Sequence, residues 1–270
     1  MDRVEAEGLE RRVQTALEKN QFRLHYQPQV ERRTGRIVGA EALLRWHDAE
    51  AGLLAPGYFL PLLESTGLIV PVGEWVLRQA AVDAQRWQRL GFPRMRIAVN
   101  LSLEQLTRYV AERREFDTRA LRECCDFQFE VPAAELVRAP ANVMRVLAAL
   151  RTEGVDVAMQ GFDAAETLCT RLWSLPVDTL KIGRAFIRGM TADPDAEVVV
   201  SSMVVLARAF RLGLIAAGVE RPDQVEMLSR IGCEQMQGLA FSPAVPAARF
   251  ERLLEGLACR PQPHVQRRLN

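Results

Sequence analysis

The chain has 270 residues, and its 35 basic and 34 acidic side chains leave a formal net charge of +1. This balance excludes proteins that bind nucleic acid or another polyanion through bulk charge. No apolar run approaches the length of a membrane span, and the first residues lack the basic-then-apolar order of a signal peptide. We therefore expect a cytoplasmic protein that contacts neither a membrane nor nucleic acid.

The five cysteines and three histidines do not have the spacing of a metal site. No two cysteines form a C-x-x-C pair, and the histidines lie far apart in the sequence. We therefore expect neither a zinc site nor a disulfide framework, and the cysteines are interpreted as buried thiols.

Apolar periodicity predicts an amphipathic helix over residues 1–20, two strands at 22–30 and 37–46, a short helix at 59–65 and a long helix at 72–90. Strands and helices then alternate. The strands are predicted at 95–101, 127–131, 155–160, 179–182, 214–219 and 235–240, and the helices that follow them at 103–111, 141–151, 166–175, 196–211, 222–231 and 247–257. Residues 259–270 contain two prolines and three arginines and are expected to form a flexible basic tail.

Short apolar strands that alternate with amphipathic helices are typical of βα units in a parallel sheet. About eight such strands within residues 21–258 match the size and strand count of an α/β protein built as one (β/α)₈ barrel domain. An open, doubly wound sheet is the alternative. No glycine-rich phosphate loop opens a predicted helix, which argues against a nucleotide-binding Rossmann or P-loop fold.

Polar side chains recur where the predicted strands end, and in a barrel the carboxyl ends of the strands carry the chemistry. These positions, together with two charged residues on an early strand, are Asn100, Gln160, Lys181, Glu220, Gln237, Glu41 and Arg45. Glu41 lies in an apolar strand and needs a cation, a metal or hydrogen-bond donors to offset its desolvation. The alternative to a ligand site is structural: Asn100 and Gln160 cap strand ends, and Lys181 pairs with Glu41.

In order and spacing, several segments together resemble the EAL domain, the bacterial domain that linearises cyclic di-GMP. The resemblance covers residues 9–257. It rests on YQP at 26–28, GAEALLRW at 39–46, TGLI at 66–69, GEWVL at 73–77, VNLS at 99–102, LPVDTLKI at 175–182, GVE at 218–220 and QG at 237–238. Family membership implies a modified TIM barrel and a mechanism in which two Mg²⁺ or Mn²⁺ ions activate a water.

The resemblance also implies that much of the catalytic set is missing. Glu41, Asn100 and Lys181 match family positions. Family carboxylates are replaced at the remaining ones, which by the resemblance are Ala133, Gln160, Gly161, Gly183 and Ala217. Asp163 and Glu135 lie near lost carboxylates, but neither would replace one without a local rearrangement. We therefore expect Glu41 and Lys181 to be vestiges of a catalytic site and Glu41 and Asn100 to be vestiges of a metal site, with no bound metal.

By the same resemblance, this sequence retains more of the family's nucleotide-contacting residues than of its catalytic residues. Gln27, Arg45 and Glu220 match the family, and with Asn100 and Gln237 they form the expected ligand-binding set. Cyclic di-GMP binding without hydrolysis is therefore one expectation. Against it, Glu41 without a metal would repel a phosphate, and FSPA at 241–244 replaces the family's F-S-R-P.

Two other functions remain open. One is a protein-interaction module that docks onto a signalling protein or a transcription regulator. The predicted helix at 196–211 is apolar around most of its girth, so it is either well buried or part of an interface with a partner or a second copy. The other is an active, metal-dependent phosphodiesterase that converts cyclic di-GMP to pGpG.

Overall fold

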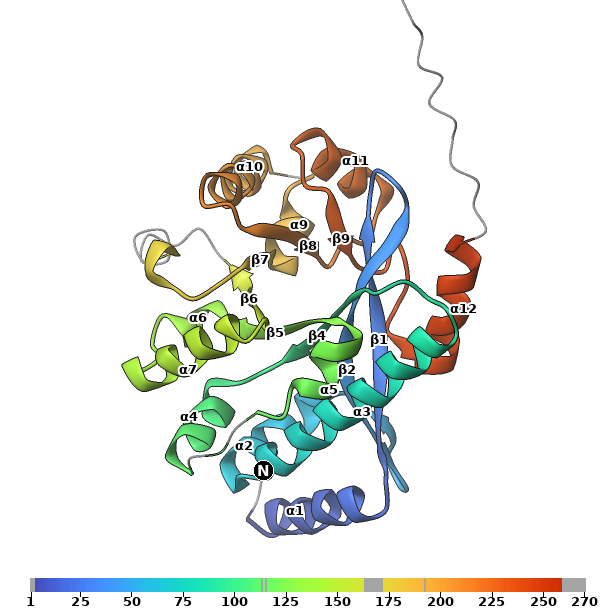
Figure 1. Cartoon of the computed structure of the whole chain (residues 1–270), viewed down its shortest axis with the longest axis vertical. Helices are drawn as coiled ribbons and strands as arrows, with labels where there is room; N and C mark the ends of the chain where they lie inside the picture. The colour runs from blue at the N-terminus through green and yellow to red at the C-terminus, as the bar shows by residue number, and fades with distance from the viewer. Residues whose placement is uncertain (1–2, 113, 115, 163–171, 192, 259–270) are drawn as a thin grey trace, which may run out of the picture.

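The computed structural model describes residues 3–258 except 113, 115, 163–171 and 192. Its centre is a closed barrel of eight strands (Figure 1): β1 (Phe22–Glu31), β2 (Arg36–Asp48), β4 (Arg96–Asn100), β5 (Asp126–Pro132), β6 (Asp156–Phe162), β7 (Thr179–Ile182), β8 (Gly213–Ala217) and β9 (Gln235–Gln237). The short strands β3 (Gly52–Leu54) and β10 (Val245–Pro246) extend it beside β2 and β1. The predicted single-domain barrel is confirmed.

The prediction that all eight strands belong to parallel βα units is wrong for β1. This strand runs antiparallel to both of its barrel neighbours, β2 and β9, whereas the ladder from β2 to β9 is parallel. Only residues 32–35 separate β1 from β2, and a parallel crossover needs a dozen residues or more. Gly35 has a φ of +68° and allows this tight hairpin turn.

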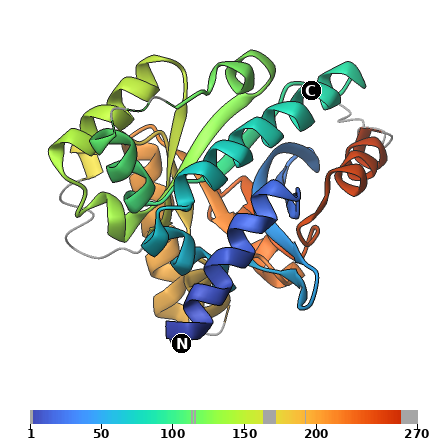
Figure 2. The same ribbon diagram turned by 90° about the horizontal axis from the view of Figure 1, so that it is seen from below.

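Helices surround the barrel (Figures 1 and 2). They are α1 (Arg3–Glu18), α2 (Leu60–Thr66), α3 (Ile69–Arg89), α4 (Leu103–Ala111), α5 (Arg119–Cys124), α6 (Ala133–Leu136), α7 (Ala141–Thr152), α9 (Arg184–Gly189), α10 (Pro194–Ala209), α11 (Pro222–Arg230) and α12 (Ala247–Ala258), with 3₁₀ turns at Pro56–Tyr58 and Leu172–Ser174. The short helices α5, α6 and α9 were not predicted. The predicted helix at 166–175 lies largely outside the described residues, and the predicted tail at 259–270 lies wholly outside them.

An aromatic layer fixes α3 and α12 against the outer face of β1. The Tyr26 hydroxyl donates to Oδ2 of Asp83 at 2.6 Å, and Trp87 Nε1 donates to Oε1 of Glu251 at 3.2 Å. Each of these two buried carboxylates therefore accepts a hydrogen bond from an aromatic side chain of the layer. None of the described helices is both long enough and apolar enough to cross a membrane.

Candidate functional site

Glu41 points into the barrel from β2 and is 5% exposed. Lys181 Nζ donates to its Oε2 at 2.6 Å, and Gln237 Nε2 donates to the same oxygen at 2.6 Å. Asn100 Nδ2 donates to Oε1 at 2.8 Å. The predicted ion pair between Glu41 and Lys181 is therefore confirmed, and three strands besides β2 contribute the donors and the cation.

A second carboxylate, Glu130 on β5, belongs to the same cluster. Its side chain is fully buried, and Lys181 Nζ donates to its two oxygens at 2.8 and 2.7 Å. Sequence reasoning did not single out Glu130. The available signal was the one that singled out Glu41, a carboxylate inside an apolar strand. Glu41, Glu130, Lys181, Asn100 and Gln237 are called the carboxylate cluster below.

Burial and mutual charge set the protonation of the cluster. Burial raises the pKa of Glu130, and the charge of Glu41 raises it further, to about 7 in spite of Lys181. Burial also acts to raise the pKa of Glu41, but Lys181 and the hydrogen bonds lower it by more. Burial lowers the pKa of Lys181 and the two carboxylates together raise it by more, so the ammonium keeps its charge. The cluster thus carries a net charge between −1 and 0 at neutral pH.

Gln27 links the cluster to the loop before β10. Gln237 Nε2 donates to Oε1 of Gln27 at 2.9 Å, and Gln27 Nε2 donates to the carbonyl oxygen of Ser242 at 3.1 Å. The structure therefore brings Gln27, Asn100 and Gln237 together around Glu41, as three of the five residues expected to bind a ligand.

The other two expected ligand residues lie elsewhere. Arg45 is four residues beyond Glu41 on β2, about 13 Å along the strand. It is half-buried, its guanidinium donates only to the carbonyl of Leu44, and burial lowers its pKa. Glu220 follows β8, forms an ion pair with Arg184 and lines a separate cavity beside α11. Among the described residues Arg45 is thus a half-buried cation that forms no salt bridge, although the charge of Glu41 acts to raise its pKa.

Positions where the sequence departs from the EAL pattern lie at the ends of elements around the barrel. Gln160 and Gly161 end β6, Ala217 ends β8, Ala133 begins α6, and Gly183 precedes α9. Gln160 lies beside Lys181 in the β6–β7 register, and Ala217 beside Gln237 in the β8–β9 register. These strand ends adjoin the cluster but contribute no carboxylate to it.

The described donors do not fit a centre of two divalent cations. Two such ions need several carboxylates to offset their repulsion. Here an ammonium bridges the two carboxylates present, and the described part of the chain has no group of three or more His, Cys, Asp or Glu side chains placed to hold a metal. Glu135 is engaged elsewhere, since its carboxylate accepts from the backbone N–H of Leu103 at 2.5 Å. Asp163 lies outside the described residues.

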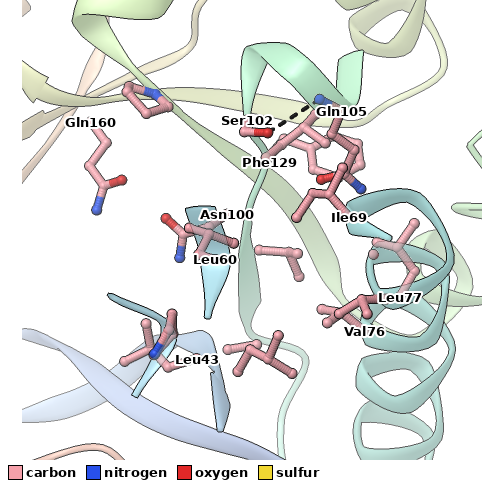
Figure 3. A pocket seen from close by; sticks show the side chains of 18 of the residues that line it. Leu43, Leu60, Ile69, Val76, Leu77, Asn100, Ser102, Gln105, Phe129 and Gln160 are labelled. Carbon is pink, nitrogen blue, oxygen red and sulfur yellow. Dashed lines mark hydrogen bonds between the residues drawn. The ribbon is translucent and has the colours of Figure 1, made fainter. Parts of the chain in front are cut away.

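A cavity of about 370 Å³ opens beside the cluster, at Glu41, Asn100 and Gln160. It runs between the barrel wall of β2 and β4 and the helices α2, α3 and α4. Figure 3 shows Leu43 and Asn100 on one side of this hollow and Val76 and Leu77 on the other. Its walls are mainly apolar, which is typical of small-molecule sites.

Comparison with known proteins identifies the family. Residues 10–244 match the model of the EAL domain. The chain is 38% identical over 248 residues to MucR of Pseudomonas aeruginosa, a bifunctional diguanylate cyclase/cyclic di-GMP phosphodiesterase, covering 91% of this chain and 36% of MucR. It is 31% identical over 247 residues to the cyclic di-GMP phosphodiesterase PdeR of Escherichia coli, covering 90% of this chain and 37% of PdeR. The chain thus spans little more than a third of these relatives.

Solved structures agree. The phosphodiesterase of MucR in complex with cyclic di-GMP has a TM-score of 0.82 at 37% identity, with 90% of this chain and 99% of that chain covered. The EAL enzyme Bd1971 in its cAMP-bound form has a TM-score of 0.83 at 28% identity, with 93% and 71% covered. Sequence and structure together place the chain in the EAL domain family.

Proposed function

We propose that this EAL domain is a regulatory protein of cyclic di-GMP signalling in the cytoplasm, which binds cyclic di-GMP without hydrolysing it. One observation carries the proposal: the ammonium of Lys181 bridges Glu41 and Glu130, while the ends of β6 and β8 add no carboxylate. The relatives support the ligand, because the similar phosphodiesterase of MucR was solved as a complex with cyclic di-GMP.

The cluster is poorly suited to hydrolysis. Attack on a phosphodiester needs an activated water and positive charge to stabilise the developing charge. Glu130 has a pKa near that of an effective general base, but both of its oxygens accept from Lys181 and its side chain is fully buried. A missing proton-transfer group alone costs a rate factor of about 10²–10⁴. We therefore infer that a bound nucleotide stays intact.

Binding needs less than hydrolysis. Lys181 neutralises Glu41, which weakens the repulsion between that carboxylate and a phosphate. Arg45 is half-buried and forms no salt bridge among the described residues, although the charge of Glu41 partly offsets its desolvation, so an anionic ligand would offset more of it.

Calorimetric titration with cyclic di-GMP in EDTA tests this proposal. Arg45→Gln should weaken binding about tenfold or more, because a charge-assisted hydrogen bond is lost. Arg89→Gln is the matched control, because Arg89 is exposed at the end of α3. If the wild-type protein shows no binding heat, the receptor function is wrong. If linear pGpG forms in Mg²⁺ or Mn²⁺, the alternative of an active phosphodiesterase holds.

A second candidate function is protein interaction through α10. The inner face of this helix is buried, but Val198 and Val205 on its outer face are 63% and 64% exposed. Glu197 lies beside Val198, and Arg208 lies three residues beyond Val205, so two antiparallel copies of α10 would pair opposite charges across a valine contact. A homodimer therefore fits this face, and a signalling or transcription protein is the alternative partner.

Light scattering over a concentration series tests the dimer. Val198→Glu combined with Val205→Glu should yield a monomer. Val82→Glu, on the exposed side of α3, should leave the molar mass measured for the wild-type protein unchanged. A monomeric wild-type protein at all concentrations would exclude the homodimer and leave only a different partner for this face.

A further inference from the structure

One buried amide in this protein faces the cavity instead of another protein group. Gln105 is 4% exposed, and its side chain lines the cavity beside α3 and β4. Its backbone N–H donates to Ser102 Oγ, but its side-chain amide has no hydrogen-bond partner within the part of the chain that the structure describes. The amide atoms are not among the described side-chain atoms that are both fully buried and unpaired, so a molecule in the cavity can reach them and hydrogen-bond to them.

The side chain of Gln105 could form a capping hydrogen bond at the start of α4, but it does not do so among the described residues. Ser102 and Gln105 form the S-x-x-Q pattern at the start of α4, in which the Gln side chain usually returns to the N-cap backbone. Gln224, three residues after Arg221 at the start of α11, behaves in this way. Its Oε1 accepts from the backbone N–H of Arg221 at 3.0 Å, and its Nε2 donates to the carbonyl of Ile187 at 3.0 Å. Gln105 instead extends towards α3.

The opposite helix makes room for this amide. Gly73 lies in the interior of the 21-residue helix α3, where glycine lowers helix stability. A Cβ at position 73 would lie 2.0 Å from Nε2 of Gln105, so any larger residue would displace the amide. Two features, a helical glycine and an amide without a hydrogen-bond partner among the described residues, therefore coincide at one end of the cavity. Figure 3 shows Gln105 beside Ile69 at this end.

The rest of the cavity lining is mainly apolar, with polar side chains that include Glu41, Asn100 and Gln160, and much of it comes from the helices packed on the barrel. Successive residues of a strand face opposite sides. Glu41 points inward, so its neighbour Ala42, which also lines the cavity, faces the helices. Val76, Leu77 and Phe129 are among the apolar residues of the walls. Gln105, Val76 and Leu77 come from α4 and α3, whereas Gln27, Arg45 and Gln237 of the proposed nucleotide site do not line this cavity.

We propose that this cavity is a separate binding site for a small, mainly apolar ring compound that carries an amide or lactam group. The ring would contact Val76, Leu77 and Phe129. The amide would donate to and accept from Gln105, which supplies the two hydrogen bonds that this buried side chain lacks.

Ligand-observed NMR titrations with benzamide and with toluene test the proposal on the full chain without nucleotide. Both probes should bind saturably to the wild-type protein, and benzamide should bind more tightly. Gln105→Leu should weaken benzamide binding about tenfold and leave toluene binding in place, because only the hydrogen bonds are lost. Val76→Phe should abolish binding of both probes. Val82→Phe, on the exposed side of the same helix, should bind both like wild type.

Several outcomes would overturn the proposal. They are no saturable binding to wild type, an unchanged benzamide affinity in Gln105→Leu, or displacement of benzamide by saturating cyclic di-GMP. If Val76→Phe does not fold, as judged by circular dichroism, the comparison of the two probes with Gln105→Leu decides alone. The titrations with benzamide and toluene contain no cyclic di-GMP, so a failure of nucleotide binding would leave their result unchanged.

Discussion

Replacing Glu130 by Gln perturbs the carboxylate cluster at its most unusual group. The pKa of this carboxyl rises from 4.5 in the unfolded chain to about 7 in the fold, through burial and the charge of Glu41. The folded protein then binds this proton more tightly than the unfolded chain. The stability contributed by the protonated form is complete below pH 4.5 and is lost as the pH rises to 7. From these two values the loss is about 2.5 kcal/mol between pH 5 and pH 8.

Glu130→Gln removes this titration and keeps an oxygen that can accept from Lys181. Urea denaturation at pH 5, 6, 7 and 8, in EDTA, measures the free energy of unfolding of both proteins. The stability of the variant relative to wild type should rise by about 2.5 kcal/mol over this range. Glu123→Gln, on the exposed surface of α5, is the control and should follow wild type within about 0.5 kcal/mol at every pH. A difference that stays constant with pH, or that falls, would refute the reasoning.

Three further substitutions test other contacts by urea denaturation at pH 7. Lys181→Met leaves two carboxylates without their cation and should cost about 3–5 kcal/mol; adding Glu130→Gln should recover part of that loss, and full stability of the single variant would contradict the ion-pair assignment. Tyr26→Phe deletes the hydroxyl that donates to buried Asp83 and should cost about 1–3 kcal/mol. Tyr109→Phe should be neutral or stabilising, because the buried hydroxyl of Tyr109 has no hydrogen-bond partner among the described residues. Equal losses at Tyr26 and Tyr109 would contradict this contrast.

Local periodicity was sufficient to predict the barrel but not the direction of every strand. Alternating strands and helices determined the count of eight strands. The antiparallel direction of β1 follows from a four-residue turn that was too short for a crossover, a signal that was present in the sequence.

The candidate site was predictable where buried charge demanded a partner. Glu41 in an apolar strand required a cation, and Lys181 supplies it. Glu130 requires one for the same reason, since it too is a carboxylate within an apolar strand, and Lys181 also supplies it. The partner of Glu220 could not be predicted, because Arg184 lies on α9, a short helix without periodicity. The fit of Gln105 over Gly73 depends on how two helices pack, which no local pattern encodes.

One measurement tests the central claim most directly. Purified protein is incubated with cyclic di-GMP in Mg²⁺ and in Mn²⁺, chromatography separates cyclic di-GMP from pGpG, and calorimetry in EDTA measures binding in parallel. The account predicts saturable binding without metal and no pGpG with either metal. Metal-dependent formation of pGpG that Glu41→Ala abolishes would contradict it.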